Sequence, residues 1–530
     1  MNSVPMASES RKRKRSVDGD ASPSACPSSS APASVSEDAA QEESGDTKGD
    51  DDGPDNESRL AVVAPKCEPR SDGDAYYKNL YARGLDFRQL ALEDADFAAV
   101  LKKSGQLDFT DPVAFLQLTK STLKRDFGLD IELPADRLCP PIPNRHNYIL
   151  WLKELLDSSS YDRPGGRLSG IDIGTGASCI YPLLGCTQRP WEFIATDLDE
   201  KSLSYAAENV KRNGLKHRIR LVQRRVPEDP LIPLDELGVD SVDFVMTNPP
   251  FYESAEEMDR LASSKMRPPD SACTGAPVEM ICDGGEVRFV GRMLAESLRL
   301  RHRVRWYTAM LGKLSSLEIL VDGLRATEGL AANFAVAEFV QGTKTRRWAV
   351  AWSFGAMRPS QAAARAIPRL YWKKILPFET EAWIGSVAGE DATAAADRLD
   401  QLMRSLDLLS WDWEKGTLTG VGRTRQNVWG RTWRRRTARE LAGTQTDADA
   451  AAASKDAELP VFGFEVSVVV AGGKGTVFCK WREGHYRGIF TSICGFIKTK
   501  LKAWGKNSSR FLEAERIPGP TEVKFEDLDG

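Results

Sequence analysis

Residues 170–176 read Gly-Ile-Asp-Ile-Gly-Thr-Gly, an apolar run that passes directly into a glycine turn. The apolar part predicts a buried strand, and the glycines permit the close backbone approach that a nucleoside cofactor requires. The turn departs from the dinucleotide pattern G-x-G-x-x-G, because Cys179 stands three residues after Gly176. This departure favours a cofactor without a pyrophosphate. A NAD-binding turn and a simple strand-to-helix connection are the alternatives.

Outward from this turn, short β-type apolar runs alternate with longer helical ones, which is typical of a parallel sheet wrapped by helices. We predict strands at residues 170–173, 192–196, 219–223, 242–247, 303–310, 335–340 and 348–354. Helices are expected at residues 201–213 and 284–299. Residues 253–282 have few large apolar side chains, so we expect a mobile loop there, beside the active site. The predicted fold class is α/β.

Composition divides the rest of the chain. Residues 1–74 are rich in Ser, Ala, Pro, Asp and Glu, which predicts a disordered tail. Residues 75–165 have mostly helical apolar spacing and are expected to form a helical lead-in to the sheet domain at 166–357. Residues 365–510 predict a separate α+β domain, with helices near 394–408 and 492–504, strands at 462–470 and 475–481, and a disordered Ala/Asp-rich insert at 444–458.

The charge and cysteine content restrict the possible partners. The formal net charge is only -4, so a nucleic-acid surface must be a local patch. The basic run at residues 11–15 is of the kind read by nuclear import machinery, although a solvated charge run or a nonspecific nucleic-acid arm would look the same. No apolar run approaches the roughly 20 residues of a membrane-spanning helix. The nine cysteines lack zinc spacing, so we expect neither a metal site nor a disulfide scaffold, in a soluble intracellular protein.

An acidic motif follows the second predicted strand. Residues 195–199 read Ala-Thr-Asp-Leu-Asp and stand about 20 residues after the glycine turn, where an acidic side chain can accept both hydroxyls of a ribose. Asp197 is the predicted ribose ligand. A helix N-cap is the competing role for either Asp197 or Asp199.

Residues 243–251, Asp-Phe-Val-Met-Thr-Asn-Pro-Pro-Phe, form an apolar strand that ends in an Asn-Pro-Pro-aromatic turn. Two prolines remove two backbone donors, so the carbonyls of the turn are left for a ligand amine. The Asn248 side-chain oxygen and the Pro249 carbonyl could each accept one hydrogen of an exocyclic amine. Phe251 offers a face for stacking the base. We predict Asn248, Pro249, Pro250 and Phe251 as the catalytic residues, with an ordinary Asn-Pro turn as the alternative.

Further short segments carry a family resemblance. They are residues 125–129 (Arg-Asp-Phe-Gly-Leu), 147–149 (Asn-Tyr-Ile), 170–185, 248–251, 284–286 (Gly-Gly-Glu), 305–307 (Arg-Trp-Tyr), 310–313 (Met-Leu-Gly-Lys) and 348–354 (Trp-Ala-Val-Ala-Trp-Ser-Phe). From about residue 108 to residue 354 the chain resembles the methyltransferase-like protein 16 family, the U6 small nuclear RNA adenine-N6 methyltransferases.

The resemblance implies a Rossmann-like domain that binds S-adenosylmethionine (SAM) and holds a target adenine. The implied cofactor residues are Arg145, Gly174 and Asp197. We predict that Asp172, Gly176 and Asn248 also contact the cofactor. The implied RNA contacts are Arg224, Arg225, Lys344, Arg346 and Arg347, with further RNA binding by residues 75–165 and by a C-terminal region resembling a kinase-associated domain. The substrate would be U6 snRNA with an adenine in a UACAGAGA-like context, or an mRNA hairpin in some members. A nuclear location is expected, with the cytoplasm as a further compartment.

Methyl transfer from a sulfonium needs no dedicated general base, since alignment and electrostatic support suffice. The four histidines are therefore expected to be surface or structural residues: His146, His217, His302 and His485. Two other functions stay open. A protein-glutamine methyltransferase could hold a carboxamide in the same turn, and a noncatalytic factor could bind RNA only.

Two clusters combine arginine with tryptophan, one at residues 346–348 and one at residues 429–436. Such clusters attract phosphates and offer stacking faces. For the second cluster, a solvated basic helix with tryptophan packed inward is the alternative.

Overall fold

The computed structural model describes residues 73–507, except for residues 83, 163, 264–274, 331–332, 342–344, 369–374, 389–391, 445–458 and 472–473. The described residues lie in the compact unit Val63–Gly530. Nearly all of the predicted tail and insert, the basic run at 11–15 and Lys344 therefore lie outside the described residues.

Helices precede the first strand. They are α1 (Gly73–Asn79), α2 (Phe87–Glu93), α3 (Ala95–Val100), α4 (Pro112–Phe127) and α5 (Ile142–Ser158). The bounds of α4 follow from its end residues. Asp111 caps the helix by accepting the backbone N–H of Val113, Pro112 occupies the first turn, and Gly128 ends the helix with a φ of 65°.

The large sheet has the strand order β3-β2-β1-β4-β5-β7-β6-β8. Its strands are β1 (Ser169–Ile173), β2 (Glu192–Asp197), β3 (Ile219–Gln223), β4 (Val242–Thr247), β5 (Val304–Leu311), β6 (Phe334–Gln341), β7 (Thr345–Trp352) and β8 (Arg365–Ala366). β1 to β5 run parallel, whereas β7 is antiparallel to both β5 and β6. The predicted α/β class is confirmed, but the expectation of a parallel sheet is wrong for β7, which runs opposite to its neighbours β5 and β6. Only residues 342–344 separate β6 from β7, and a parallel crossover needs a dozen or more.

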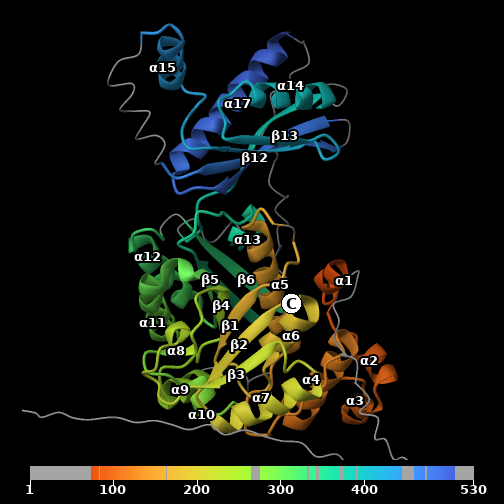
Figure 1. The fold of residues 1–530 in the computed structure, drawn as a ribbon. Helices are drawn as coiled ribbons and strands as arrows, with labels where there is room; N and C mark the ends of the chain where they lie inside the picture. The colour runs from red at the N-terminus through yellow and green to blue at the C-terminus, as the bar shows by residue number, and fades with distance from the viewer. Residues whose placement is uncertain are drawn as a thin grey trace, which may run out of the picture. The chain divides into compact units, whose positions relative to one another are not determined.

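Helices cover both faces of this sheet (Figure 1). The remaining helices around it are α6 (Ile180–Gln188), α7 (Glu200–Arg212), α8 (Leu234–Leu237), α11 (Gly285–Leu300), η1 (Arg301–Arg303), α12 (Leu314–Ala326) and α13 (Gln361–Ala364). Alternate residues of β4 serve two cores. Phe244 and Met246 belong to the core shared with α4 to α7, and Val245 belongs to the core shared with α11 and α12.

The predicted loop at 253–282 contains α9 (Ala255–Ser263) and α10 (Pro277–Met280). The expectation of a segment without helices is therefore wrong. The first turn of α9 is acidic, with Glu256 and Glu257. Tyr252 pairs with Ile281, which returns the chain to the end of β4.

The second sheet is antiparallel, with the order β10-β11-β12-β13-β9. Its strands are β9 (Glu381–Ala388), β10 (Ser410–Glu414), β11 (Thr419–Thr424), β12 (Phe462–Ala471) and β13 (Lys474–Glu483), and helices α14 (Ala392–Arg404), α15 (Arg431–Leu441) and α17 (Arg487–Asn507) accompany it. The predicted α+β class of this region is confirmed. Among all the described helices, none combines the length and the apolar character that a membrane span requires.

Gly170 sets the packing between β1 and β4. It pairs with Phe244, and a Cβ atom on Gly170 would lie 2.3 Å from the Phe244 ring. That ring packs against Trp191 and Phe193, with centroid distances of 5.0 and 5.5 Å. A larger side chain at residue 170 would therefore displace an aromatic cluster behind the glycine turn.

We predict that Gly170→Val lowers the midpoint of thermal unfolding by roughly 3 to 10 °C, because overpacking a core costs about 1–3 kcal/mol. The matched control is Gly166→Ala, since nothing lies within 4 Å of a Cβ atom at that position. Differential scanning fluorimetry measures both midpoints. Equal midpoints for the two variants would contradict the packing argument.

Candidate active site

The carboxyl ends of β1, β2 and β4 lie side by side at one edge of the large sheet, where open α/β sheets bind ligands. The turn after β1 uses left-handed backbone at Gly174 and Gly176, with φ of 74° and 64°, which glycine adopts without strain. The backbone N–H groups of Gly174 and Thr175 both donate to the Thr196 carbonyl, at 2.9 and 3.0 Å. These bonds fix the turn to the end of β2.

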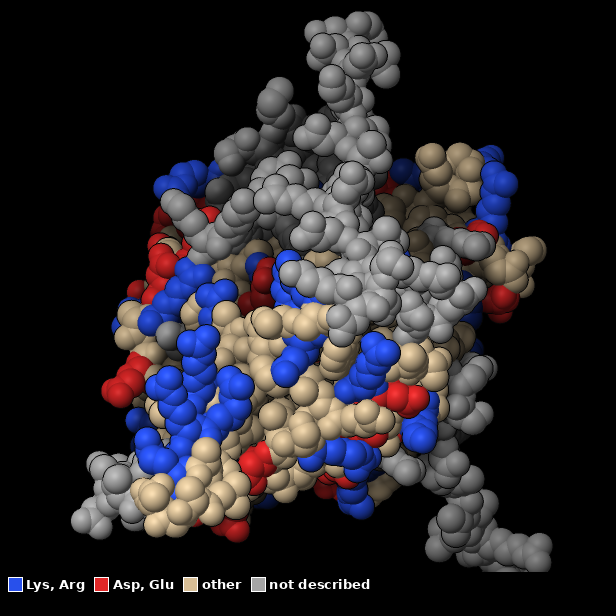
Figure 2. Space-filling view, turned by 90° about the horizontal axis from the view of Figure 1, so that it is seen from above, with Lys and Arg blue, Asp and Glu red and all other residues tan. Residues whose placement is uncertain are grey.

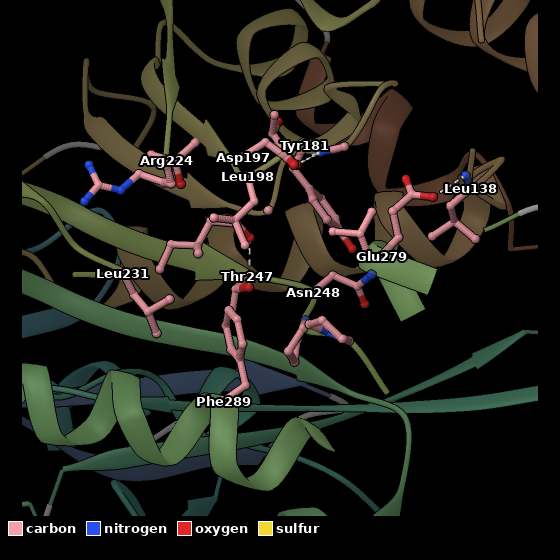
Figure 3. Close-up of a pocket in the computed structure, with 18 of the residues that line it drawn as sticks. Leu138, Tyr181, Asp197, Leu198, Arg224, Leu231, Thr247, Asn248, Glu279 and Phe289 are labelled. Carbon is pink, nitrogen blue, oxygen red and sulfur yellow. Dashed lines mark hydrogen bonds between the residues drawn. The ribbon is translucent and has the colours of Figure 1, made fainter. Parts of the chain in front are cut away.

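A pocket opens at this edge (Figure 3). Its walls include the predicted site residues Arg145, Gly174, Gly176, Asp197, Arg224, Asn248, Pro249 and Pro250. Leu198, Leu231 and Phe289 supply apolar surface. The structure therefore brings together residues from α5 and from the ends of four strands that are distant in the sequence.

Asp197 and Asp199 have different roles. Asp199 is the N-cap of α7, where its carboxylate accepts the Ser202 N–H at 2.8 Å. Asp197 faces the pocket, and its two oxygens accept the N–H groups of Gly176 at 2.8 Å and Asp199 at 2.9 Å. Burial raises the pKa of the Asp197 carboxyl. The N-cap alternative thus applies to Asp199 and leaves Asp197 in the position for a ribose.

The Asn248 side-chain oxygen is buried and has no hydrogen-bond partner among the described residues. Leaving a buried acceptor unpaired is costly, so the arrangement favours a ligand that donates a hydrogen there. The neighbouring Thr247 hydroxyl donates to the Ile173 carbonyl at 2.9 Å, a bond drawn in Figure 3. It ties the end of β4 to the end of β1 and fixes the turn that carries Asn248.

Phe251 is absent from the pocket lining and lies just beyond it. A Cβ atom on Gly312 would lie 2.8 Å from the Phe251 ring, so only glycine fits at the end of β5. The guanidinium carbon of Arg347, on β7, lies 5.5 Å from the ring centroid. The structure therefore shows Arg347 over the ring that the sequence predicts as a stacking face for a base.

Glu286 is a site residue that the sequence reasoning missed. Its carboxylate is buried and accepts the backbone N–H groups of Gly312 at 2.6 Å and Lys313 at 3.0 Å. Burial raises its pKa. Glu286 thereby fixes the backbone of Gly312, against which the Phe251 ring packs. The sequence signal for it is the Gly-Gly-Glu segment at 284–286, which is part of the family resemblance and opens the predicted helix at 284–299.

Arg145, on α5, is 5% exposed and lines the pocket. Its guanidinium lies 5.7 Å from the centroid of the Tyr181 ring and bonds the Met310 sulfur at 3.6 Å. It forms no ion pair with a carboxylate among the described residues. A buried and unpaired guanidinium is suited to binding the carboxylate of a ligand.

Asp172 lies beneath the glycine turn and is absent from the pocket lining. It is fully buried, and both of its carboxylate oxygens lack hydrogen-bond partners among the described residues. Burial raises its pKa to about 7. The expected direct contact between Asp172 and a cofactor is therefore not what the structure shows, because the side chain of a central strand points into the core.

Two of the predicted RNA-binding arginines are already paired. Arg224 lies in the pocket wall, and its guanidinium binds Glu236 at 2.8 Å. Arg346 binds Glu338 at 2.7 Å. These carboxylates offset part of the positive charge that each arginine could offer to a phosphate.

The three remaining residues that were predicted to contact RNA are Arg225, Arg347 and Lys344. Arg225 is exposed beyond β3. Arg347 lies over Phe251, and burial lowers its pKa. Lys344 falls outside the described residues. Of the predicted RNA contacts in the described chain, only Arg347 lies against the predicted catalytic turn.

The pocket fits a nucleoside cofactor that carries an amino-acid group. Asp197 suits a ribose, and Arg145 suits a carboxylate. The unpaired Asn248 oxygen suits an amine beside the cofactor. Among the described residues, no cluster of three or more potential metal ligands is present. Fold and site together define the class of protein as an α/β methyltransferase acting on a planar amine.

The comparisons with known proteins agree with this class. A family model described as RNA methyltransferase matches residues 73–356, which is more than half of the chain. The U6 small nuclear RNA (adenine-(43)-N(6))-methyltransferase of Schizosaccharomyces pombe is 35% identical over 405 residues, covering 76% of this chain and 96% of that protein. The chain belongs to this RNA methyltransferase family. It is an enzyme that uses SAM as its methyl donor.

Two further similarities cover part of the chain. The human RNA N(6)-adenosine-methyltransferase METTL16 is 42% identical over 295 residues, which is 53% of this chain and 51% of that protein. The solved N-terminal domain of human METTL16 in complex with SAH has 38% identity, covers 54% of this chain and 98% of that chain, and has a TM-score of 0.43.

The buried Asp172 predicts a pH dependence of stability. Its pKa is about 7 in the folded protein and near 3.9 in an unfolded chain, so the folded state binds the additional proton between these values. Stability contributed by the protonated group is therefore lost as the pH rises, by about 1.4 kcal/mol per pH unit up to pH 7. We predict that Asp172→Asn loses less thermal stability than the wild type between pH 5 and pH 8. Parallel pH profiles of the thermal midpoint, measured without cofactor, would contradict this.

Proposed function

We propose that this enzyme transfers the methyl group of SAM to the N6 amine of an adenosine in a structured RNA, with U6 snRNA as the principal substrate. The observation that carries the proposal is the buried and unpaired Asn248 oxygen, at the end of β4 beside a nucleoside pocket. An mRNA hairpin is a further substrate to test. The names of the relatives support the choice of adenosine and of U6.

The turn at 248–251 aligns the amine. The Asn248 oxygen and the Pro249 carbonyl accept its two hydrogens, which directs the nitrogen lone pair away from them. Bound SAM supplies an electrophilic methyl group on a positively charged sulfur. The nitrogen forms the new bond to the methyl carbon, the electron pair of the carbon–sulfur bond stays on sulfur, and one amine proton passes to water. No side chain need act as a general base.

We assign Arg145 to the carboxylate of SAM, Asp197 to its ribose, and Gly174 and Gly176 to the turn that allows the close approach. Asp172 lies buried beneath this turn and does not line the pocket, so we assign it no direct contact with SAM. Phe251 stacks on the target adenine after Arg347 leaves the ring, and Arg347 then becomes available to a phosphate of the RNA.

RNA binding outside the catalytic pocket is assigned to basic surface. Basic side chains gather in clusters on one face of the molecule (Figure 2). On α15 no residue is buried, and Arg431, Arg434, Arg435 and Arg439 are exposed. Trp429, by contrast, is buried in the C-terminal core, as the inward-packing alternative predicts for that residue. We propose α15 as part of an RNA-binding C-terminal region, 365–510, and residues 75–165 as a second RNA-binding region.

The proposed substrate places the enzyme in the nucleus, and the basic run at residues 11–15 is the proposed import signal. Fusing residues 1–74 to a reporter protein would test the signal. Nuclear accumulation that is lost when the five basic residues are replaced by alanine supports it.

We predict that Asn248→Ala lowers kcat for methylation of a U6-type hairpin by at least about 100-fold, the usual effect of removing one preorganised polar contact to the reacting group. The Kd for the same RNA should stay within about threefold. Gln401→Ala, which removes an exposed amide from α14, is the control and should leave kcat unchanged. Radiolabel transfer gives kcat, and fluorescence anisotropy gives Kd.

Either of two results would reject the proposal. An Asn248→Ala enzyme with nearly normal kcat would exclude the turn as the catalytic centre. A wild-type protein that binds the hairpin tightly but transfers no methyl group would favour the noncatalytic RNA-binding factor. Transfer to a glutamine-containing peptide in place of RNA would favour the protein methyltransferase.

A further inference from the structure

Glu279 is a pocket residue to which neither the sequence motifs nor the proposed catalytic steps assign a role. It belongs to α10, in the segment that follows the catalytic turn, and it lines the pocket with Gly176, Asp197 and Asn248. Figure 3 shows its carboxylate reaching toward Leu138. A carboxylate in the lining of such a pocket is suited to binding a positively charged group of the ligand.

The two oxygens of Glu279 differ. Oε2 accepts the backbone N–H groups of Leu138 and Ala276, both at 2.9 Å. Oε1 has no hydrogen-bond partner among the described residues. It lies 3.7 Å from the position that a Cβ atom on Gly176 would occupy, so it is close to the glycine turn. One oxygen thus fixes the carboxylate to the protein, and the other is available to a ligand in the pocket.

Asp197 and Asp229 are the other carboxylates of the pocket, and Asp229 forms an ion pair with Arg224, on the side of the pocket opposite Glu279. Both oxygens of Asp197 accept backbone N–H groups. Asp229 uses one oxygen to accept the N–H groups of Arg225 and Val226. Glu279 is therefore the pocket carboxylate beside the glycine turn that keeps a whole oxygen unbound in the described structure.

The position of Glu279 indicates which part of SAM it faces. Asp197 marks the ribose, and the labelled residues Arg224 and Leu231 lie on the opposite side of the pocket from Glu279 and Leu138 (Figure 3). An adenine extending beyond the ribose toward Arg224 and Leu231 leaves the methionine part on the Glu279 side. That part is a zwitterion, with one carboxylate and one ammonium group.

We propose that Glu279 binds the α-ammonium group of SAM, while Arg145 binds the α-carboxylate; this inference rests on the proposed placement of the cofactor in the pocket. The pair recognises an amino acid by complementary charge, which a neutral nucleoside cannot satisfy. Burial raises the pKa of Glu279, and a bound ammonium would favour its ionised form. Glu279 belongs to α10, which follows the proposed catalytic turn in sequence, and it also accepts the Leu138 N–H. A bond from Glu279 to the ammonium group would therefore connect α10 and Leu138 to the cofactor.

The test compares three ligands on Glu279→Gln. Glutamine retains an oxygen for the Leu138 and Ala276 N–H groups, but it places an amide N–H₂ donor where the free oxygen was. Isothermal titration measures Kd for SAM, for S-adenosylhomocysteine (SAH), and for 5′-methylthioadenosine, which has no ammonium and no carboxylate. We expect SAM and SAH to weaken about 10- to 100-fold and 5′-methylthioadenosine to change less than about twofold.

Three results would overturn the assignment. Equal weakening of all three ligands would mean that Glu279 acts only by holding α10. Weakening of SAM alone would indicate the sulfonium as its partner, and unchanged affinity for all three would exclude a contact. Glu257→Gln is the charge control, because Glu257 pairs with Lys313 and does not line the pocket. Thermal midpoints verify that each variant is folded.

The proposed function fails in a different way. If the wild type does not bind SAH, the cofactor site itself is misplaced. If the wild type binds SAH and Glu279→Gln weakens that binding as expected, but the wild type methylates no RNA, the substrate assignment fails while the Glu279 contact stands.

Discussion

The proposed catalytic turn, residues 248–251, has to hold an unpaired acceptor in a fixed position, and the neighbouring strand ends hold that turn in place. Two prolines follow Asn248, so the turn lacks two of the backbone donors with which it could fasten itself. It is held from outside instead. Thr247 bonds the end of β1, and Tyr252 pairs with Ile281 on the returning segment. Within the part of the chain that the structure describes, the Asn248 oxygen is thereby left buried and without a partner.

Glycines make this arrangement possible at points of close approach. Gly170 leaves room for Phe244 behind the cofactor turn, and Gly312 leaves room for Phe251 at the catalytic turn. Glu286 holds the backbone at Gly312 from beneath. Two carboxylates thus lie near the turn: Glu279 lines the pocket with Asn248, and Glu286 binds the backbone of Gly312, beside Phe251. Both come from the stretch of chain that follows the turn in sequence.

The sequence predicts those parts of the fold whose signals are local. The strands β1 to β5 are apolar runs bounded by turn residues, and the structure contains all of them within a residue or two of the predicted bounds. The glycine turn and the Asn-Pro-Pro-Phe segment are predictable because a few adjacent residues fix their backbone chemistry. The edge strand β10 was missed because its side chains alternate between exposed and half-buried, which leaves no apolar run.

The parts that the sequence could not predict depend on contacts between distant residues. Nothing near Glu286 in sequence indicates that it bonds residues 312 and 313. The burial of Asp172 follows from the register of a central strand, and the free oxygen of Glu279 follows from its bond to Leu138. The pairing of Arg224 with Glu236 likewise appears only once β3 and α8 are placed.

The central claim is that one amine of one adenosine is held at the Asn248 turn. The most direct measurement is methyl transfer from labelled SAM to a U6-type hairpin containing UACAGAGA, compared with the same hairpin in which the central adenosine is replaced by purine riboside. Purine riboside lacks only the exocyclic amine. The account predicts that transfer disappears while RNA affinity is retained. Equal transfer to both hairpins would show that the enzyme methylates another position and would contradict the account.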